Sequence, residues 1–258
     1  MTLHYRALPD PMGADLGPLP ETGEHSPWSY SNGAPYRAIE VNVPVLKPGP
    51  ALPGLNRRYA HLGKRAFDIV LASVALFLAA PVLVLLSALL WIESGNPFYA
   101  QERLGINGKR FRMWKLRTMV QDAEAQLADC LSDNPALRAE WDHAQKLKID
   151  PRVTPIGRLL RKTSMDELPQ VFNVLMGDMS LVGPRPMLPD QMPLYRYPQA
   201  YLGVRPGITG LWQVTARNEE SFDLRAILDL RYAQRLSFGL DLKIIASTFG
   251  VIWRATGY

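Results

Sequence analysis

The stretch IVLASVALFLAAPVLVLLSALLWI, residues 69–92, contains 24 uncharged residues in a row, and the interpretation of the whole chain depends on it. At 1.5 Å per residue, a straight helix of this length is about 36 Å long, which exceeds the roughly 30 Å hydrocarbon core of a bilayer. A soluble domain rarely buries so long an apolar helix. The stretch therefore predicts a membrane segment.

Pro81 lies near the middle of this stretch and predicts a kink. A proline removes the backbone hydrogen bond to the carbonyl four residues earlier, here that of Phe77, and its ring crowds that turn. An ordinary span carries more Lys and Arg on its cytoplasmic side, but here Lys64-Arg65 precede the stretch and Arg103 follows it. Positive charge at both ends is typical of a re-entrant helix that bends at Pro81 and returns to the same face. The residues alone leave a kinked span equally open.

Composition limits the class of protein. The chain has 258 residues, a net charge of +5 and a single cysteine, Cys130, which excludes an internal disulfide and fits a reducing compartment. Between Gly54 and Val120 there are ten Lys or Arg and three acids, so this region alone carries +7. Basic charge beside an apolar segment indicates attraction to anionic lipid head groups or to a phosphorylated substrate. Because no nucleic-acid-binding motif accompanies the charge, we expect no nucleic-acid partner.

Two regions follow from the distribution of proline. Residues 1–53 contain ten of the 22 prolines and little periodic hydrophobicity. Such a segment buries too little apolar surface to offset the entropy of ordering it, so we predict a disordered tail over residues 1–55. The predicted folded domain covers residues 56–258 and includes the membrane helix, 68–93.

The rest of this domain is predicted to be mainly α-helical with one short β-hairpin. The pair Asn107-Gly108, between aromatic and β-branched residues, is a hairpin turn signal. Helices are expected over 119–149 with a new start at Asn134-Pro135, after Pro169 up to about Gly177, over 222–236 and over 241–256. The last of these is apolar around most of its circumference, so it is either an interfacial membrane helix or a buried core helix.

The densest polar constellation is TSMDELPQ, residues 163–170. The adjacent carboxylates Asp166 and Glu167 could bind a divalent cation, and one of them could act as a nucleophile towards phosphorus. The competing interpretation is a helix capping box formed by Ser164 and Glu167. Taken alone, the residues favour the capping box, although Pro169 argues for acids that lie in a turn just before the helix.

Two other segments carry cations in defined positions. Arg185 lies between two prolines in GPRP, residues 183–186, and a guanidinium held in this way suits bidentate phosphate binding, although a surface loop is the simpler interpretation. Lys115 and Arg117 end the predicted hairpin, where a solvated strand is the simpler interpretation. The sequence contains no phosphate-binding glycine motif, no HExxH and no histidines at metal-ligand spacing.

Taken together, these segments resemble the bacterial sugar transferases, and more closely the monotopic phosphoglycosyl transferases that begin the assembly of exopolysaccharides and other surface glycans. The insertion between Met119 and Asp150 is similar to members acting on UDP-hexoses. The resemblance extends from about Arg57 to the C-terminus and rests on the proline-broken apolar stretch and on KRAFD (64–68), QERLG (101–105), KLRTM (115–119), DPR (150–152), DELPQ (166–170), GDMSLVGPRP (177–186) and PGITGLWQV (206–214).

The resemblance implies a reaction and roles for individual residues. Asp166 would attack the β-phosphate of a UDP-sugar, releasing UMP, and undecaprenyl phosphate would then take the sugar phosphate from the aspartate. Glu167 would position metal or acceptor phosphate, and Mg²⁺ held by Asp166 would offset the charge of the diphosphate. The implied substrate- and phosphate-binding residues are Lys115, Arg117, Arg158, Arg161, Arg185 and Gln213.

The resemblance also implies a location: a helix that re-enters at Pro81, interfacial amphipathic helices, and a site on the cytoplasmic face of the bacterial inner membrane. The expected partners are a UDP-sugar, with galactose or glucose as leading candidates, undecaprenyl phosphate and membrane lipid. A homo-oligomer is left open. Two departures from the family pattern stand out, Ala80 in place of a serine before the kink proline, and Arg235-Leu236-Ser237 in place of Asn-Trp-Ser.

Two other functions compete with this one. The first is a membrane-tethered scaffold that organises polysaccharide assembly without catalysis. The second is a conventional glycosyl transferase with a lipid-linked acceptor, which would release UDP rather than UMP. The intact Asp166-Glu167 pair argues against the scaffold, and the nucleotide released separates the two enzymes.

Overall fold

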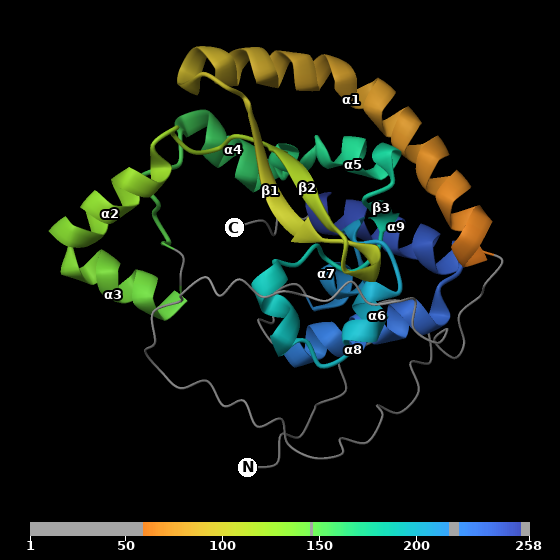
Figure 1. Ribbon diagram of the computed structural model, residues 1–258. Coiled ribbons are helices and arrows are strands. Elements are labelled where there is room, and N and C mark those ends of the chain that lie inside the picture. Colours follow the sequence, from red (N-terminus) through yellow and green to blue (C-terminus); the bar gives the residue numbers. More distant parts are fainter. Residues whose placement is uncertain (1–58, 145–146, 217–221, 254–258) are drawn as a thin grey trace. The chain divides into compact units, whose positions relative to one another are not determined.

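The computed structural model describes residues 59–144, 147–216 and 222–253 (Figure 1). The predicted N-terminal tail, residues 1–55, lies outside the described residues. The described part is mainly helical and contains one antiparallel β-hairpin, which confirms the predicted fold class at this level. Its α-helices are α1 (Lys64–Ser94), α2 (Ala123–Asp133), α3 (Pro135–Ala144), α4 (Pro155–Thr163), α5 (Gln170–Met176), α6 (Pro198–Leu202), α7 (Leu211–Thr215), α8 (Phe222–Arg235) and α9 (Phe238–Trp253).

The apolar stretch forms most of α1, whose 31 residues make a helix about 46 Å long. The helix continues through Pro81 without a break, and in Figure 1 its ribbon bends between the orange start and the yellow end. Only 17 % of its most apolar 18-residue window is buried. A helix that exposes large apolar side chains such as Phe77 and Trp91 is compatible with membrane association and unlike the core helix of a soluble protein. Its return to the same membrane face stays a prediction.

The predicted hairpin is confirmed. Strands β1 (Phe98–Leu104) and β2 (Arg110–Leu116) pair antiparallel, from Phe98 opposite Leu116 to Leu104 opposite Arg110. Asn107 and Gly108 both have positive φ angles, 57° and 78°. Asn and Gly are the residues that tolerate this backbone at the end of a hairpin.

The hairpin contributes to three buried apolar clusters along its length. Its Leu116 end packs with Leu83, Leu86 and Leu90 of α1 and with Leu160 of α4. Phe111 and Met113, further along β2, pack with α5 and with the first half of α1. Its Leu104 end belongs to a third cluster that contains no α1 residue; the other buried members are Met187, Met192, Tyr195, Tyr201, Leu202 and Ala226. The hairpin therefore extends from α1 to α6 and α8.

Two predicted helix starts differ from those observed, since α2 begins at Ala123 rather than at residue 119 and α9 begins before residue 241. The region 119–149 holds α2 and α3 with the expected break, and Asn134 Oδ1 accepts from the backbone N–H groups of Ala136 and Leu137. However, α9 begins at Phe238 rather than Asp241. Ser237 explains the shift, because its Oγ accepts from the Leu240 N–H and so caps the helix three residues earlier.

The side chains of α9 divide between two environments. Ile244 is fully buried, whereas Phe238, Leu242 and Phe249 are exposed. Neither of the two alternatives, core helix or interfacial helix, describes the whole surface of α9.

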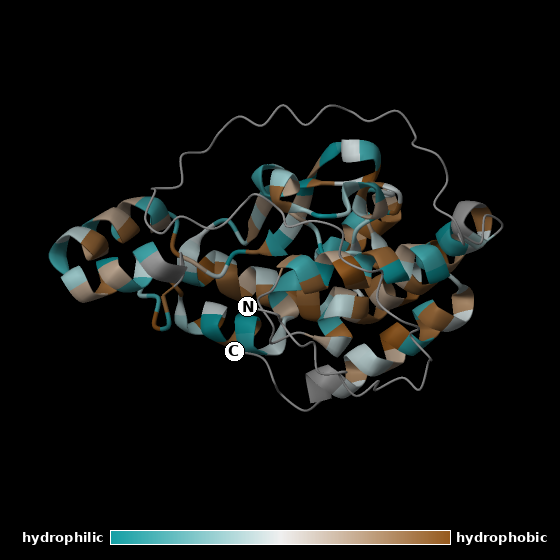
Figure 2. Cartoon of the chain, turned by 90° about the horizontal axis from the view of Figure 1, so that it is seen from below, coloured by the Kyte–Doolittle hydropathy of each residue, from teal (hydrophilic) through white to brown (hydrophobic). Residues whose placement is uncertain are grey.

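The hydropathy view in Figure 2 shows hydrophobic residues gathered in the helices near the centre, while the α2–α3 pair at the left mixes hydrophobic and hydrophilic residues.

A short parallel pair, β3 (Ser180–Val182) and β4 (Gly207–Thr209), was not predicted. Each strand has three residues, which is too short for a recognisable alternating pattern. The backbones approach closely, since a Cβ added at Gly207 would lie 2.1 Å from the Gly183 nitrogen. This pair sets the start of the Arg185 loop, which leaves β3 at Gly183.

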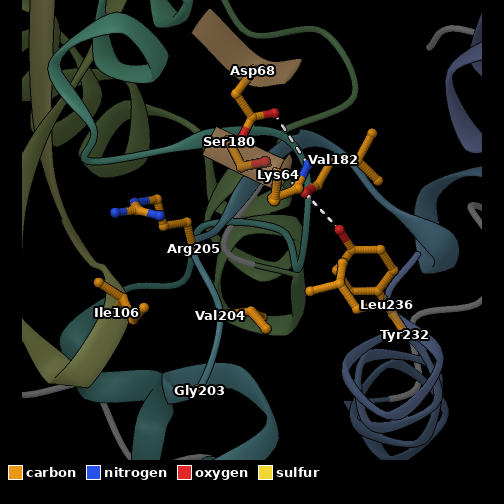
Figure 3. Close-up of a pocket in the computed structure, with 10 residues that line it drawn as sticks. All are labelled: Lys64, Asp68, Ile106, Ser180, Val182, Gly203, Val204, Arg205, Tyr232 and Leu236. Atoms are coloured by element: carbon orange, nitrogen blue, oxygen red, sulfur yellow. Dashed lines mark hydrogen bonds and ion pairs between the residues drawn. The ribbon is translucent and has the colours of Figure 1, made fainter. Parts of the chain in front are cut away.

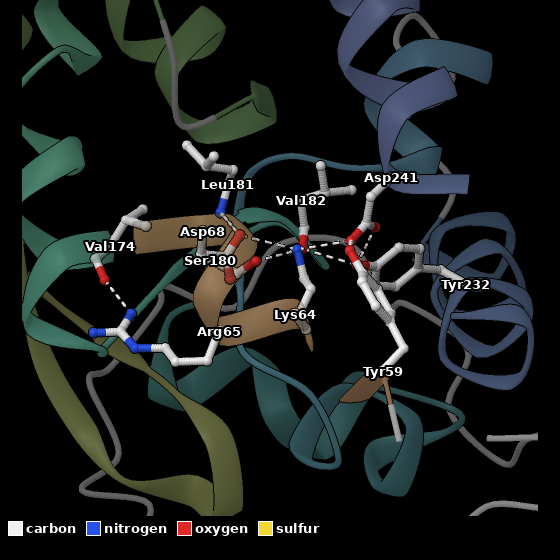
Figure 4. Close-up of polar contacts among 10 residues, drawn as sticks. All are labelled: Tyr59, Lys64, Arg65, Asp68, Val174, Ser180, Leu181, Val182, Tyr232 and Asp241. Carbon is white, nitrogen blue, oxygen red and sulfur yellow. Dashed lines mark hydrogen bonds and ion pairs between the residues drawn. The ribbon is translucent and has the colours of Figure 1, made fainter. Parts of the chain in front are cut away.

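A buried network of charged groups ties the first turn of α1 to β3 and α9 (Figure 4). Lys64 Nζ lies 3.1 Å from Asp68 Oδ1 and 3.0 Å from Asp241 Oδ2, and both carboxylate side chains are 0 % exposed. Asp68 also accepts from the Leu181 N–H, and Tyr59 donates to Asp241. One ammonium thus offsets two buried carboxylates from opposite ends of the described chain.

Replacing Lys64 with alanine should destabilise the protein strongly, because Asp68 and Asp241 would remain buried without a cation. Breaking a buried ion pair costs on the order of 3–5 kcal/mol. The measurement is thermal or denaturant unfolding of the purified protein in detergent. Lys109→Ala is the matched control, since its ammonium lies 3.9 Å from Asp178 and its side chain is 77 % exposed; an exposed pair contributes about 0–1 kcal/mol. Equal losses of unfolding free energy in Lys64→Ala and Lys109→Ala would contradict the role of Lys64 as the cation of a buried ion-pair network.

Candidate active site

The Asp166-Glu167 pair lies in a tight turn between two helices. Helix α4 ends at Thr163, Ser164 has a left-handed φ of 57°, and residues Met165–Glu167 form a single 3₁₀ turn before α5. The Ser164 side chain makes no capping hydrogen bond, so the predicted capping box is wrong. The physical reason is the left-handed Ser164, which turns the chain away from a continuous helix. The acids lie in the turn before α5, as Pro169 indicated.

Lys115 of β2 reaches this turn. Its Nζ lies 2.7 Å from Glu167 Oε1 and 3.7 Å from Asp166 Oδ2, and all three side chains are largely buried. The expectation of a solvated strand is therefore wrong for Lys115, whose side chain points to the same hairpin face as Phe111 and Met113. The contact joins residues that are 52 positions apart in the sequence.

Charges around Asp166 act in opposite directions. Burial raises the pKa of Asp166 above its ordinary value, Lys115 lowers it, Glu167 raises it and Arg161 lowers it, with a net increase. The Asp166 carboxylate is therefore poorly hydrated, and the nearby Lys115 ammonium balances its charge. Such a group suits attack on an electrophile better than hydrated carboxylates do.

Of three further predicted cations, only one acts on the acidic pair. Arg161 of α4 donates from Nε to Thr118 Oγ1 at 2.9 Å and acts electrostatically on Asp166. Arg158 is exposed on the same helix, and Arg117 donates to the Phe98 carbonyl at 3.3 Å. The structure thus brings Lys115 and Arg161 to the acidic pair, while it gives Arg117 and Arg158 no contact with it among the described residues.

The described contacts of Arg185 and Gln213 are with other elements. Arg185 is exposed in the loop after β3, and its carbonyl accepts from the Arg225 guanidinium of α8. Gln213 of α7 donates to the Ile208 carbonyl at 3.0 Å. Arg185 also acts electrostatically on Arg103 of β1. Arg103 lies in the motif at 101–105, so the sequence contained a signal for it, whereas nothing in the sequence pointed to Arg225.

The oxygen ligands available for a metal ion are few. Among the described residues, no three His, Cys, Asp or Glu side chains gather as a complete protein site. Mg²⁺ commonly binds through one or two carboxylates, with waters and substrate phosphates completing its shell. The adjacent Asp166 and Glu167 carboxylates fit that incomplete donor set.

A small pocket lies beside the buried network and not at this site (Figure 3). Its polar lining includes Lys64, Asp68, Ser180, Arg205 and Tyr232, and it contains none of the acidic pair or Lys115. Among the residues that the structure describes, Asp68 Oδ2 has no hydrogen-bond partner.

Comparisons with known proteins point to one family. The model of the bacterial sugar transferase family matches residues 59–255. The exopolysaccharide production protein ExoY of Rhizobium meliloti is 41 % identical over 210 residues, which are 81 % of this chain and 93 % of that protein. The undecaprenyl-phosphate galactose phosphotransferase of Salmonella typhimurium is 42 % identical over 204 residues, and these cover 79 % of this chain but only 43 % of the relative. The undecaprenyl-phosphate glucose phosphotransferase of Komagataeibacter xylinus is 42 % identical over 224 residues, 80 % of this chain and 39 % of the relative.

Replacing Lys115 with methionine should move the pH dependence of any reaction that needs ionised Asp166. The ammonium lowers the pKa of Asp166, so its loss raises that pKa further. Only the ionised carboxylate reacts. As the pH is lowered, Lys115→Met should therefore lose activity at a higher pH than the wild type does. The measurement is the acidic limb of kcat/KM against pH, with Lys115→Arg expected to keep the wild-type limb. An unchanged limb in Lys115→Met would contradict the electrostatic coupling.

Proposed function

The chain belongs to the bacterial sugar transferase family, and we propose that it is a phosphoglycosyl transferase that transfers a hexose 1-phosphate from a UDP-sugar to undecaprenyl phosphate. The observation that carries the proposal is the largely buried Asp166-Glu167 pair with Lys115 beside it, on a fold that exposes a long apolar helix. The relatives named for galactose and for glucose transfer support a hexose, and the ExoY relatives support a role in exopolysaccharide synthesis.

The proposed reaction has two displacements at one phosphorus atom. A carboxylate oxygen of Asp166 bonds to the β-phosphorus, the bond from that phosphorus to the bridging oxygen breaks, and UMP leaves with the electron pair. An oxygen of undecaprenyl phosphate then attacks the same phosphorus, and the bond to the aspartate breaks. Undecaprenyl-diphospho-sugar results, and the Asp166 carboxylate is restored.

Lys115 and Arg161 support this reaction by their charge. Lys115 Nζ lies within ion-pair distance of both acids, so it stabilises the ionised nucleophile before attack and faces the phosphate oxygens during it. Arg161 also favours ionised Asp166. Glu167, paired with Lys115 at 2.7 Å, holds the ammonium in place and would position the acceptor phosphate.

Mg²⁺ is part of the proposal. Asp166, with Glu167 beside it, would hold the ion, which when bound supplies positive charge to the diphosphate. In the structure the two carboxylates share one ammonium, that of Lys115. One ammonium balances only one of their two negative charges, and a divalent cation would offset the other. We expect chelation to abolish turnover and added Mg²⁺ to restore it.

The site also needs access to a lipid phosphate. The turn Met165–Glu167 follows α4, whose Leu160 packs on the apolar helix α1. Met165, Phe172 and Met176, around the acidic pair and on α5, are exposed apolar side chains. This supports a site at a membrane surface. The proposal places that surface on the cytoplasmic face of the inner membrane, with α1 re-entering at Pro81, as the resemblance implies.

Asp166→Asn should abolish turnover, by on the order of 10³-fold or more, because the amide is not a nucleophile towards phosphorus. The assay uses purified protein, Mg²⁺, undecaprenyl phosphate and UDP-galactose or UDP-glucose, with UMP and UDP separated by chromatography. Without acceptor, mass spectrometry should detect a phosphosugar on Asp166 of the wild type and none in the variant. Asp129→Asn, an exposed acid of α2, is the matched control.

Two outcomes would reject this function, and a third would reject only its mechanism. Release of UDP would indicate a conventional glycosyl transferase. Folded wild-type protein without turnover on any UDP-sugar would favour the scaffold. Full activity in Asp166→Asn would remove the covalent mechanism while leaving the transferase.

The re-entrant helix predicts that both chain ends lie on the cytoplasmic side. Tyr5→Cys and Tyr258→Cys, each made in a Cys130→Ser background, should react with a membrane-impermeant maleimide only after the cells are permeabilised. A spanning α1 would separate the two positions, so labelling of one of them in intact spheroplasts would show that α1 crosses the membrane.

A further inference from the structure

Asn173 of α5 is a fully buried polar residue that takes no part in the two proposed displacements. An amide is costly to bury unless its donor and its acceptor both find partners. Here both partners are backbone groups of β2: Nδ2 donates to the Arg112 carbonyl at 2.8 Å, and Oδ1 accepts from the Trp114 N–H at 3.0 Å. We call these two hydrogen bonds the Asn173 clamp. They join α5 to the strand that carries Lys115.

The clamp uses the edge of β2 that faces away from β1. In an antiparallel pair, every second residue bonds across the pair, and the residues between them direct their N–H and C=O groups outward. Arg112 and Trp114 lie opposite Glu102 and Ala100, and their bonds to Asn173 show that they are outward residues. The side-chain amide therefore pairs with β2 as the backbone of a neighbouring strand would.

Asn173 is itself held in a fixed position. Its backbone carbonyl accepts from three successive N–H groups just after α5, those of Gly177, Asp178 and Met179. The Arg65 guanidinium of α1 donates to the carbonyls of the two residues that follow Asn173. Because the backbone at this point is bonded on both sides, the amide defines where β2 lies relative to α5.

Apolar packing also holds β2 to α5, but it fixes the position less narrowly. Phe111 and Met113 share one buried cluster with Val171 and Val174 of α5. Apolar contacts are non-directional, so a small displacement within the cluster costs little. A displacement of about 1 Å, in contrast, takes an N–H···O pair out of its usual range of about 2.7–3.2 Å. The clamp is therefore the sharper constraint on the strand.

Both partners of the Lys115 ion pair lie next to the clamp along the chain. Lys115 directly follows Trp114, and the turn Met165–Glu167 leads into α5. Lys115 Nζ lies 2.7 Å from Glu167 Oε1 and 3.7 Å from Asp166 Oδ2. Coulomb attraction falls with distance. A strand released from α5 would thus leave the ammonium farther from the acids and would raise the pKa of Asp166, which Lys115 lowers.

We propose that Asn173 is a positioning residue for the transfer reaction, because its clamp holds β2 against α5 and so keeps the Lys115 ammonium at the Asp166-Glu167 pair. This inference rests on the proposed function, since it assigns Asn173 to the reaction of Asp166. In this role Asn173 acts through Lys115 and not by contact with a substrate.

The test is a double-mutant cycle between Asn173→Ala and Lys115→Met, measured as kcat/KM for UMP release across pH with purified protein in detergent. Asn173→Ala should lower kcat/KM at neutral pH by on the order of tenfold and move its acidic limb to higher pH, in the same direction as Lys115→Met. In the Lys115→Met protein, Asn173→Ala should change kcat/KM by less than about twofold and leave the limb in place. Losses that multiply in the double variant would overturn the proposal, since Asn173 would then act independently of Lys115.

Tyr201→Phe is the matched control. Tyr201 is also fully buried, and its hydroxyl donates to the Leu104 carbonyl at 2.7 Å and accepts from the Met187 N–H at 3.0 Å. The variant loses two buried hydrogen bonds, one of them to the hairpin, but at the end away from Lys115. Its thermal unfolding temperature should fall as that of Asn173→Ala does, while its acidic limb stays at the parent's pH. A limb that moves equally in both variants would show a general effect of a weakened fold and would reject the assignment.

Asn173→Gln answers the same question if the alanine protein does not fold. It keeps both hydrogen-bonding groups for β2, while its additional methylene increases the distance between β2 and α5. Its acidic limb should also move to higher pH, and the move should vanish in the Lys115→Met protein. Failure of both Asn173 variants to fold would overturn the proposal, because the residue would then be required by the fold rather than by the reaction.

Failure of the proposed function has a different signature in the same assay. A folded wild type that releases no UMP would reject the proposed function together with the role of Asn173. A wild type that releases UMP, with the limb of Asn173→Ala at the parent's pH, would reject the positioning role alone.

Discussion

The contact of Lys64 with Asp68 and Asp241 is the constraint on which the rest of the structure depends. It brings the first turn of α1 together with α9, and Asp68 extends the contact to β3 through the Leu181 N–H. A buried ion pair contributes little net stability, because desolvation offsets most of its attraction. Its effect is specificity, since another arrangement of these elements would leave carboxylates buried without a cation. Arg65, the next residue, donates to the Val174 and Leu175 carbonyls and so fixes the end of α5 against α1.

The position of the acidic pair follows from this anchoring. With α5 held against α1, the turn Met165–Glu167 that precedes α5 has a defined place beside β2. The side-chain amide of Asn173 strengthens the same junction, because it donates to the Arg112 carbonyl and accepts from the Trp114 N–H. Lys115 follows Trp114 directly, so the register of this junction sets the distance between its ammonium and the two acids. The apolar helix α1 and the acidic pair are thereby linked through side-chain-to-backbone hydrogen bonds.

Local sequence signals predicted local structure well, and for identifiable reasons. Asn107-Gly108 predicted a hairpin because both residues tolerate positive φ, and Asn134-Pro135 predicted a helix start because one caps and the other lacks an N–H that needs a partner. The capping box failed because Ser164 is left-handed, which a spacing rule does not reveal. The pair β3–β4 was missed because strands of three residues carry no pattern. For the candidate site, the resemblance proposes roles for individual residues, but it could not predict which of them lie together.

The sequence by itself determined the apolar helix, the hairpin, the acidic turn before α5 and the family. These depend on residue type and short spacing, which a linear chain displays directly. Only the tertiary structure decided that Lys115 meets Glu167 across 52 residues and that Arg225 of α8 donates to the carbonyl of Arg185. It also decided that the Lys64 ammonium is shared by Asp68 and Asp241, which lie near opposite ends of the described chain. Such contacts follow from how helices and strands pack, and distance along the chain says nothing of distance in space.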